Sequence, residues 1–169
     1  MKPSPTVTRI GVLSDTHGNL PLMRAVVAMM LDKFRVDAIY HLGDNYADSA
    51  ELETHHLRVL NVPGLYCQEY TSHLIPKKIW DHVGGLAIVM AHARQDLTDD
   101  DTAKADVILC GHTHAYEALR RGKRLFVNPG HLKAETHKDR PATFGIVEIA
   151  DGKAHAKILN LEGNVVTEA

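Results

Sequence analysis

Six carboxylate and imidazole side chains stand directly after short apolar runs of this 169-residue sequence, where buried strands would end. They are Asp15, His17, Asp44, His92, His112 and His114. The first two belong to "SDTHGN" and the last two to "GHTH", and in extended backbone side chains two residues apart point the same way. Mixed carboxylate and imidazole ligation suits Mn, Fe, Ni or Zn better than Ca or Mg, so the pattern predicts a metal site.

Asp44 is the natural shared ligand if two metal ions bind. It is the lone carboxylate of the central "GDN" loop, and the preceding Gly43 allows close approach of the backbone. Two metals that share a carboxylate stand roughly 3.5 to 4 Å apart and hold a hydroxide between them. Because Cys67 and Cys110 form no CxxC pair, a catalytic centre is favoured over a structural zinc cage.

The elements that must position these residues alternate in type along the first half of the chain. Apolar runs of strand length are separated by segments of helical length, which predicts a β-α-β-α-β order and parallel neighbouring strands. We expect strands at 8–14, 37–42 and 57–62, with helices at 20–34 and 47–56. The loops that follow the strands should meet at one edge, where open α/β sheets bind ligands.

The second half changes to a hairpin pattern. Paired apolar runs with glycine turns predict hairpins over 77–92, 117–130 and 143–161. We expect them to form a second, largely antiparallel sheet that packs on the first, with helices outside, and the acidic segment 96–106 to begin a helix. The expectation is one α/β domain over residues 1–169, with a flexible stretch at 1–7.

Composition excludes several classes of protein. A hydrophobic content of 44% with a net charge of -2 indicates a globular protein without the basic field that nucleic-acid binding needs. No run reaches the length of a membrane span, and the first residues contain no apolar secretory core. We therefore expect a cytoplasmic protein that does not engage membranes, and a homodimer is the default oligomer.

The ordered motifs DxH, GD, a later His, GHxH and "NPG" resemble the calcineurin-like metallophosphoesterases, in particular the small bacterial and archaeal phosphodiesterases. The resemblance runs from about residue 9 to about residue 150. It implies two mixed sheets sandwiched between helices in an α/β/β/α arrangement. It also implies hydrolysis of phosphate esters or nucleotide-like substrates by a hydroxide that bridges two divalent metals, with Mn as the leading candidate and Ni, Fe or Zn as alternatives.

Each role is carried over by position within the matching motifs. The first metal would be held by Asp15, His17, Asp44 and His114, and the second by Asp44, His92 and His112. The bridging position makes Asp44 a catalytic as well as a metal-binding residue.

The sequence departs from the family pattern at three places. The family's "GNHD" or "GNCD", which supplies an asparagine to the second metal, is replaced by "VPGLYCQEY", so Tyr66, Cys67 or Gln68 would have to substitute. Arg94 follows His92 where the family has "HGH", and its planar guanidinium suits a substrate phosphate, so Arg94 is the second candidate catalytic residue beside Asp44. His131 follows "NPG" in place of a small residue, either as a ligand or as a phosphate contact.

Structural explanations compete with each functional one. Strand-end capping is the alternative for five of the proposed ligands, and a satisfied core histidine is the alternative for the sixth, His92. A solvated loop position is the alternative for Arg94 and His131. A packed aromatic ring is the favoured interpretation for Tyr66 and a small apolar side chain for Cys67, while His41 is expected to pack behind the site. Three functions follow: a two-metal phosphodiesterase, an enzyme with one altered metal site, and a degenerate scaffold like the retromer subunit of this fold.

Overall fold

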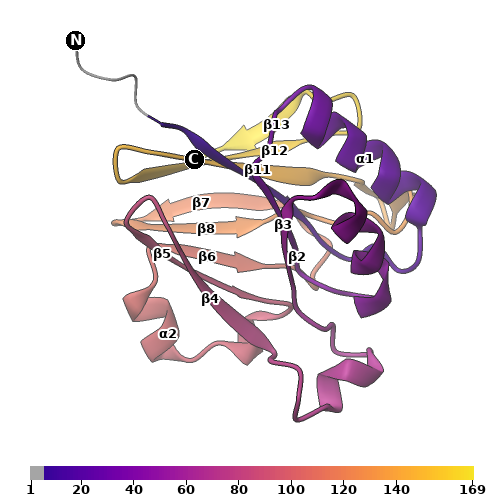
Figure 1. Cartoon of the computed structure of the whole chain (residues 1–169), viewed down its shortest axis with the longest axis horizontal. Coiled ribbons are helices and arrows are strands. Elements are labelled where there is room, and N and C mark those ends of the chain that lie inside the picture. The colour runs from indigo at the N-terminus through magenta and orange to yellow at the C-terminus, as the bar shows by residue number, and fades with distance from the viewer. Residues whose placement is uncertain (1–5) are drawn as a thin grey trace.

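The computed structural model describes residues 6–169, in which two β-sheets pack face to face between helices (Figure 1). The first sheet has the strand order β13-β12-β11-β1-β2-β3. Its strands are β1 (Thr8–Leu13), β2 (Ala38–His41), β3 (Arg58–Asn61), β11 (Phe144–Ala150), β12 (Lys153–Leu159) and β13 (Val165–Glu168). The parallel strands β1, β2 and β3 lie beside the antiparallel group that begins with β11, so this sheet is mixed.

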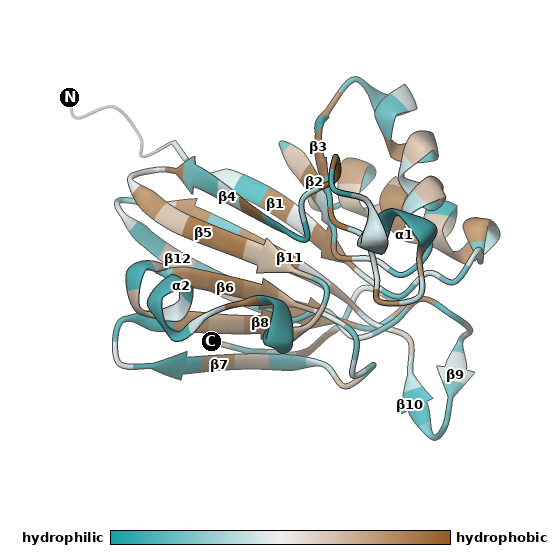
Figure 2. Ribbon diagram, turned by 90° about the horizontal axis from the view of Figure 1, so that it is seen from below, coloured by the Kyte–Doolittle hydropathy of each residue, from teal (hydrophilic) through white to brown (hydrophobic). Residues whose placement is uncertain are grey.

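The second sheet has the order β4-β5-β6-β8-β7 and is also mixed. Its strands are β4 (Lys78–Val83), β5 (Leu86–Ala91), β6 (Val107–Cys110), β7 (Glu117–Arg121) and β8 (Arg124–Asn128). The outer pairs β4–β5 and β7–β8 are antiparallel hairpins, whereas β6 runs parallel to both of its neighbours. A separate two-stranded ribbon, β9 (Thr136–His137) and β10 (Arg140–Pro141), projects from the body (Figure 2).

Strand alternation divides the apolar side chains between three cores. Ile10 and Val12 of β1 face Ile88 and Met90 of β5 in the core between the sheets. Leu13 points to the other face of the first sheet. The apolar surface of α1 (Leu20–Asp32) packs there, and α2 (Asp99–Lys104) lies over the outer face of the second sheet. The predicted α/β/β/α layering is confirmed, because each sheet buries one face on the other and one under a helix.

The helix at 96–106 is short, and its start has a clear cause. The side chain of Thr98 accepts a hydrogen bond from the Asp101 amide, and the Asp101 carboxylate accepts one from the Thr98 amide, which together form a capping box. Only α2 (Asp99–Lys104) follows, and it provides the crossover that makes β5 and β6 parallel.

Several details differ from the sequence-based expectations. The hairpin over 143–161 joins the first sheet, where β11 pairs antiparallel with β1, and so the second sheet is less antiparallel than predicted. Segment 47–56 forms the 3-10 helix η1 (Tyr46–His55) in place of an α-helix. The first error concerns long-range strand pairing, which local periodicity does not report.

Two further expectations concern the ends and the surface of the chain. The stretch expected to be flexible, 1–7, lies largely outside the described residues, which begin at residue 6. The first strand, β1, begins at Thr8. Among the described helices, none has the length and apolar character needed to cross a bilayer.

Candidate metal centre

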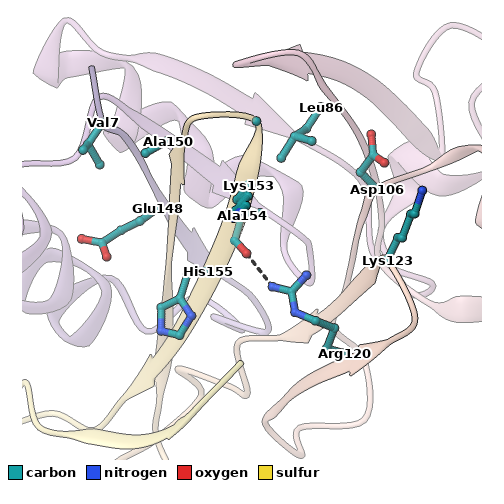
Figure 3. A pocket seen from close by; sticks show the side chains of 11 residues that line it. Val7, Leu86, Asp106, Arg120, Lys123, Glu148, Ala150, Lys153, Ala154 and His155 are labelled. Carbon is teal, nitrogen blue, oxygen red and sulfur yellow. Dashed lines mark hydrogen bonds between the residues drawn. The ribbon is translucent and has the colours of Figure 1, made fainter. Parts of the chain in front are cut away.

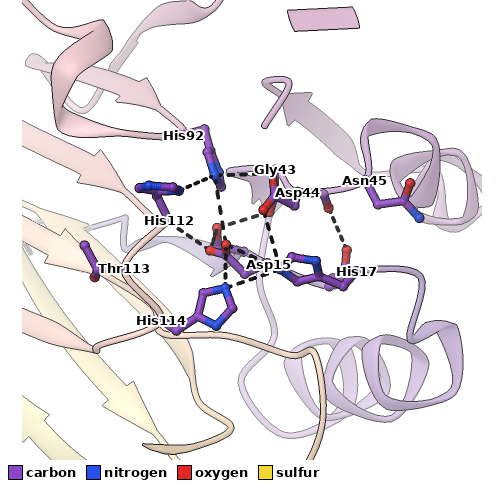
Figure 4. A network of polar contacts seen from close by, with 12 residues as sticks. Asp15, His17, Gly43, Asp44, Asn45, His92, His112, Thr113 and His114 are labelled. Atoms are coloured by element: carbon purple, nitrogen blue, oxygen red, sulfur yellow. Dashed lines mark hydrogen bonds and ion pairs between the residues drawn. The ribbon is translucent and has the colours of Figure 1, made fainter. Parts of the chain in front are cut away.

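The six residues singled out in the sequence come together at one edge of the sandwich (Figure 4). They follow four strands, β1, β2, β5 and β6, whose carboxyl ends face the same edge. Asp15 and His92 are fully buried, and Asp44 is almost so. His17 is more exposed and stands toward the mouth of the site.

Asp44 lies between two imidazoles, as its proposed bridging role requires. One carboxylate oxygen, Oδ2, is 3.4 Å from Nε2 of His17, and the other, Oδ1, is 3.3 Å from Nε2 of His92. Nδ1 of His112 lies a further 3.2 Å from Nε2 of His92. The chain of contacts therefore leads from one imidazole pair to the other through a single carboxylate.

Asp15 is a second shared centre, and its central position was not expected from the sequence. Its Oδ1 atom is 3.1 Å from Nε2 of His114, 3.9 Å from that of His17 and 4.0 Å from that of His92. Two groups of side chains are close enough to hold a metal ion, and Asp15 belongs to both. They are Asp15 with His17 and His114, and Asp15 with Asp44 and His92.

Two buried carboxylate oxygens of this cluster lack hydrogen bonds. Oδ1 of Asp15 and Oδ1 of Asp44 have no hydrogen-bond partner, although leaving a buried acceptor unpaired costs about 1 to 3 kcal/mol. Both atoms face imidazole nitrogens across 3 to 4 Å. A donor set of carboxylate oxygens and imidazole nitrogens with free lone pairs fits a divalent transition metal.

Neighbouring groups fix the orientation of Asp15 and the tautomer of His92. The other oxygen of Asp15 accepts hydrogen bonds from the Ser14 hydroxyl at 2.6 Å and from the His112 amide at 3.0 Å. Nδ1 of His92 lies 2.7 Å from the Leu42 carbonyl, to which it must donate, so Nε2 carries the lone pair.

The charge states agree with this arrangement. Burial opposes ionisation of Asp15, but the neighbouring histidines and Ser14 outweigh it and hold the pKa of Asp15 below its ordinary value. Burial lowers the pKa of His17, although Asp44 and Asp15 act in the opposite direction. At neutral pH the site therefore offers an ionised carboxylate and a neutral imidazole, which are the forms that bind metals.

The backbone at the cluster is left-handed and not extended. The φ angles are 55° at Asp15, 47° at His17, 69° at His112 and 60° at His114. The extended-backbone explanation for the shared direction of each pair is therefore wrong. Such conformations cost of order 1 to 3 kcal/mol per residue and concentrate at functional sites, where the surrounding structure enforces them.

Two glycines leave room for the carboxylates. A Cβ atom on Gly64 would lie 1.7 Å from Oδ1 of Asp44, and one on Gly111 would lie 2.0 Å from the Ser14 hydroxyl oxygen and 2.8 Å from Oδ2 of Asp15. Both backbones therefore pass directly against the cluster, and no other residue type fits at either position.

A buried carboxylate that the sequence analysis did not single out supports the first loop. Asp48 accepts hydrogen bonds from the Thr16 hydroxyl at 2.6 Å, the Gly18 amide at 2.9 Å and the Asn45 side chain at 2.7 Å. Its position three residues after Asn45, in a stretch expected to be helical, gave no distinctive signal. His41 behaves as expected: it is fully buried and contacts Thr16, with Nε2 3.1 Å from the hydroxyl oxygen.

Arg94 lies outside the cluster. Its guanidinium carbon is 4.6 Å from the ring centroid of Phe126, on the outer side of the second sheet. The guanidinium lines a hollow of about 510 Å³ that His112 and Thr113 border from the other side. Arg94 is thus near one wall of the site and separate from the six central side chains.

The segment at the missing asparagine lies beside the cluster. Tyr66 is 87% exposed, so the expectation of a packed aromatic ring is wrong. The Cys67 sulfur accepts a hydrogen bond from the Asn45 amide at 3.1 Å. Residues 66–69 border a hollow of about 470 Å³ beside His17 and Asp44, but within residues 6–169 neither Cys67 nor Glu69 belongs to a metal-holding group.

His131 is fully buried behind His114, with ring centroids 5.2 Å apart. Its Nε2 atom lies 2.9 Å from the Arg140 carbonyl, and its Nδ1 atom has no hydrogen-bond partner. His131 therefore stands on the His114 side of the cluster, away from the His92 and His112 pair that the missing asparagine would complete.

Comparison with known proteins gives a consistent result. Residues 8–152 match the model of the calcineurin-like phosphoesterase superfamily domain. A Streptococcus pneumoniae protein described as a predicted phosphoesterase is 24% identical, with a TM-score of 0.71 over 98% of this chain and 99% of that chain. The Escherichia coli phosphoesterase Yfce is 19% identical, with a TM-score of 0.74 over 96% and 98%.

The fold is shared more widely. Vps29 of Entamoeba histolytica, solved in complex with Zn²⁺, is 18% identical, with a TM-score of 0.69 over 96% of this chain and 97% of that chain. A search of curated protein sequences gave no significant match.

Proposed function

The chain belongs to the calcineurin-like phosphoesterase superfamily, and from this premise we propose that it is a metal-dependent phosphodiesterase. The observation that carries the proposal is the pair of buried carboxylate oxygens without hydrogen-bond partners, each facing imidazole nitrogens. A protein without a metal cation would gain nothing from keeping these atoms unsatisfied at the end of its core.

We assign one metal to Asp15, His17, Asp44 and His114 and the second to Asp44, His92 and His112. When bound, two divalent cations would withdraw negative charge from the phosphoryl oxygens of the substrate and lower the pKa of the attacking water. We propose Mn as the metal, since the ligands combine oxygen and nitrogen donors. Ni, Fe and Zn also accept such mixed ligands and are the alternatives.

The protein's own groups prepare this chemistry. The Leu42 carbonyl fixes the tautomer of His92, so Nε2 faces Asp44. The hydrogen bonds from Ser14 and His112 orient Asp15 without occupying its other oxygen. The substrate phosphate then approaches from the open side, where His17 and Tyr66 border the hollows.

Arg94 has weaker support as a catalytic residue than the sequence suggested. Its guanidinium packs over Phe126 and shares only the hollow beside His112 with the centre. We propose a peripheral role, as a contact for an ester group that extends along that hollow.

The test combines metal content with hydrolysis. Protein stripped with chelator is reconstituted with Mn²⁺, Ni²⁺ or Zn²⁺, the bound metal is counted by elemental analysis, and hydrolysis of bis(p-nitrophenyl) phosphate is measured. We expect two ions per chain and a loss of about a thousandfold in kcat/KM for Asp44→Asn. The exposed Asp100→Asn is the matched control and should retain wild-type turnover. Equal turnover in Asp44→Asn would refute the shared-carboxylate mechanism.

The altered second site defines the alternative. Neither Cys67 nor Glu69 joins a metal-holding group in the described part of the chain, and the fold is shared with Vps29, so a protein-binding scaffold is the second candidate. A scaffold has no chemical need for buried, unpaired Asp15 and Asp44, which favours the enzyme. One ion per chain would indicate an enzyme with one working metal site, and none would indicate the scaffold.

A further inference from the structure

A group of cations stands beside the proposed metal centre and is not used by it. Lys133, Lys138 and Arg140 come from the ribbon β9–β10 and the segment before it, which projects from the body at this edge (Figure 2). We call these three residues the cationic rim. Together with His17, Asp44 and His114 they line one hollow of about 260 Å³.

The charges of the rim are free to act on a ligand. Within residues 6–169 none of the three takes part in an ion pair. Two acidic residues, Glu135 and Asp139, belong to the same segment, but neither lines the hollow. The side of the hollow opposite the carboxylates is therefore cationic.

The rim is fixed to both walls of the site. Arg140 donates a hydrogen bond from Nη1 to the Thr113 carbonyl at 3.1 Å, between the two histidines of the "GHTH" loop. The Asn19 side chain donates to the Lys133 carbonyl at 3.0 Å and ties the ribbon to the start of α1. These anchors hold the guanidinium beside the cluster and leave its remaining donors available.

The tip of the ribbon is also defined. Lys138 and Asp139 are the two central residues between β9 and β10, and their φ angles are 49° and 60°. Two successive positive φ angles are the geometry of a tight two-residue hairpin turn. His137, just before the tip, has its ring centroid 5.3 Å from that of His114, so the ribbon reaches the edge of the proposed metal centre.

We infer that the site takes a phosphate ester that carries a second phosphate, which the cationic rim binds. The inference rests on the proposed function, in which the two metal ions already neutralise the phosphate that is cleaved. Three further unpaired cations exceed what that single phosphate needs. An arginine fork combined with lysine point charges is an arrangement suited to phosphate oxygens.

Binding measurements test the rim separately from catalysis. Isothermal titration calorimetry with metal-reconstituted protein compares AMP, ADP and adenosine 3′,5′-bisphosphate as probes. We expect ADP or the bisphosphate to bind about tenfold more tightly than AMP, because charge-assisted hydrogen bonds add to the affinity. Preference for ADP places the second phosphate next to the first, and preference for the bisphosphate places it across the sugar.

Variants assign that preference to the rim. The binding ratio is the affinity for the better of ADP and the bisphosphate divided by the affinity for AMP. In Lys138→Ala/Arg140→Ala we expect this ratio to fall below about threefold. Arg140→Lys keeps the charge and loses the planar fork, so the ratio should fall only part of the way. Lys123→Ala/Lys153→Ala removes two cations at the opposite end of the sandwich and should keep the wild-type ratio. A wild-type ratio within twofold of unity, or equal losses in the two double variants, would overturn the inference.

The outcome is separable from that of the proposed function. If the metal-loaded protein hydrolyses bis(p-nitrophenyl) phosphate while the wild-type binding ratio stays near unity, the phosphodiesterase stands and the rim inference is wrong. If the binding ratio is high and depends on the rim but no hydrolysis occurs, the second phosphate site stands and the catalytic proposal fails.

Discussion

At one end of the sandwich, β5 and β6 begin around a hollow of about 910 Å³, bordered by Arg120, Glu148 and Lys153 (Figure 3). At the other end the same strands finish at the Asp and His cluster, beside hollows of about 470 and 260 Å³. The larger hollow is the one without unpaired buried groups. Of the five buried side-chain atoms that lack partners in the described chain, three belong to Asp15, Asp44 and His131 at the cluster end.

Three charged residues that border the large hollow, Arg120, Glu148 and Asp106, already have partners in the protein. Arg120 donates to the Ala154 carbonyl at 2.5 Å, Glu148 pairs with Arg9 at 3.2 Å, and Asp106 accepts from the Ala87 amide at 2.8 Å. The comparison shows that unsatisfied buried polar groups, more than cavity size, distinguish the end where we propose the metal centre.

Asp44→Asn should have the largest effect on this contrast between the two ends, because it removes one of the unsatisfied carboxylates. Without metal, the variant removes a buried charge that lacks a full set of partners, so we expect the free energy of unfolding to rise by about 1 kcal/mol. With saturating Mn²⁺, the wild type should gain about 4 kcal/mol at a thousandfold excess over Kd, and the variant far less. Scanning calorimetry with chelator and with Mn²⁺ measures both. A variant that is less stable than the wild type in chelator would contradict the account.

Gly64→Ala tests the packing against the same carboxylate. The new methyl group would lie 1.7 Å from Oδ1 of Asp44, so the loop or the carboxylate must shift. We expect a loss of about 2 kcal/mol in denaturant unfolding, together with loss of tight metal binding. Gly145→Ala is the control, because its methyl group would meet Val12 at an ordinary 3.5 Å. Tight metal binding in Gly64→Ala would show that the approach is not needed.

Asp101 is a buried carboxylate that, unlike Asp44, has its hydrogen-bond partners within the protein. Lys78 at 2.6 Å, together with Thr98, lowers the pKa of Asp101 to about 2 from 3.8. A depressed folded-state pKa means that its stabilisation is complete above pH 3.8 and disappears as the pH falls toward 2. Asp101→Asn should cost about 1 kcal/mol at pH 7 and nothing near pH 2, as followed by urea unfolding. The exposed Asp99→Asn serves as control, and a pH-independent difference would refute the assignment.

Arg120→Ala should give the smallest effect. It removes the hydrogen bond to Ala154 that joins the two sheets at the large hollow, with an expected cost of about 0.5 to 1 kcal/mol in thermal unfolding. Metal content and phosphodiester turnover should stay at wild-type values. A change in either would mean that the two ends are coupled.

The gathering of the candidate side chains at one edge was predictable from the sequence because it depends on local patterns. Asp15, Asp44 and His92 each follow an apolar run, and parallel strands present their carboxyl ends at one edge. The layering followed from the periodicity of the strands and of α1 for the same reason.

The remaining features depend on contacts that are distant in sequence. The left-handed backbone at His112 and His114 is enforced by neighbouring loops, and the support that Asp48 gives Thr16 crosses more than thirty positions. Whether the hairpin over 143–161 joins one sheet or the other is decided by its pairing with β1, for which strand periodicity contains no information.

That last pairing has a consequence for how the protein matures. β1, which ends at the cluster, pairs with β2 early in the chain but also with β11, where Thr8 faces Ile149. Contacts of such long sequence separation form slowly, since a long loop must close first. While residues 144–150 are still being synthesised, β1 remains an open edge of the first sheet. We therefore expect the proposed metal centre to be complete only after nearly the whole chain has been synthesised.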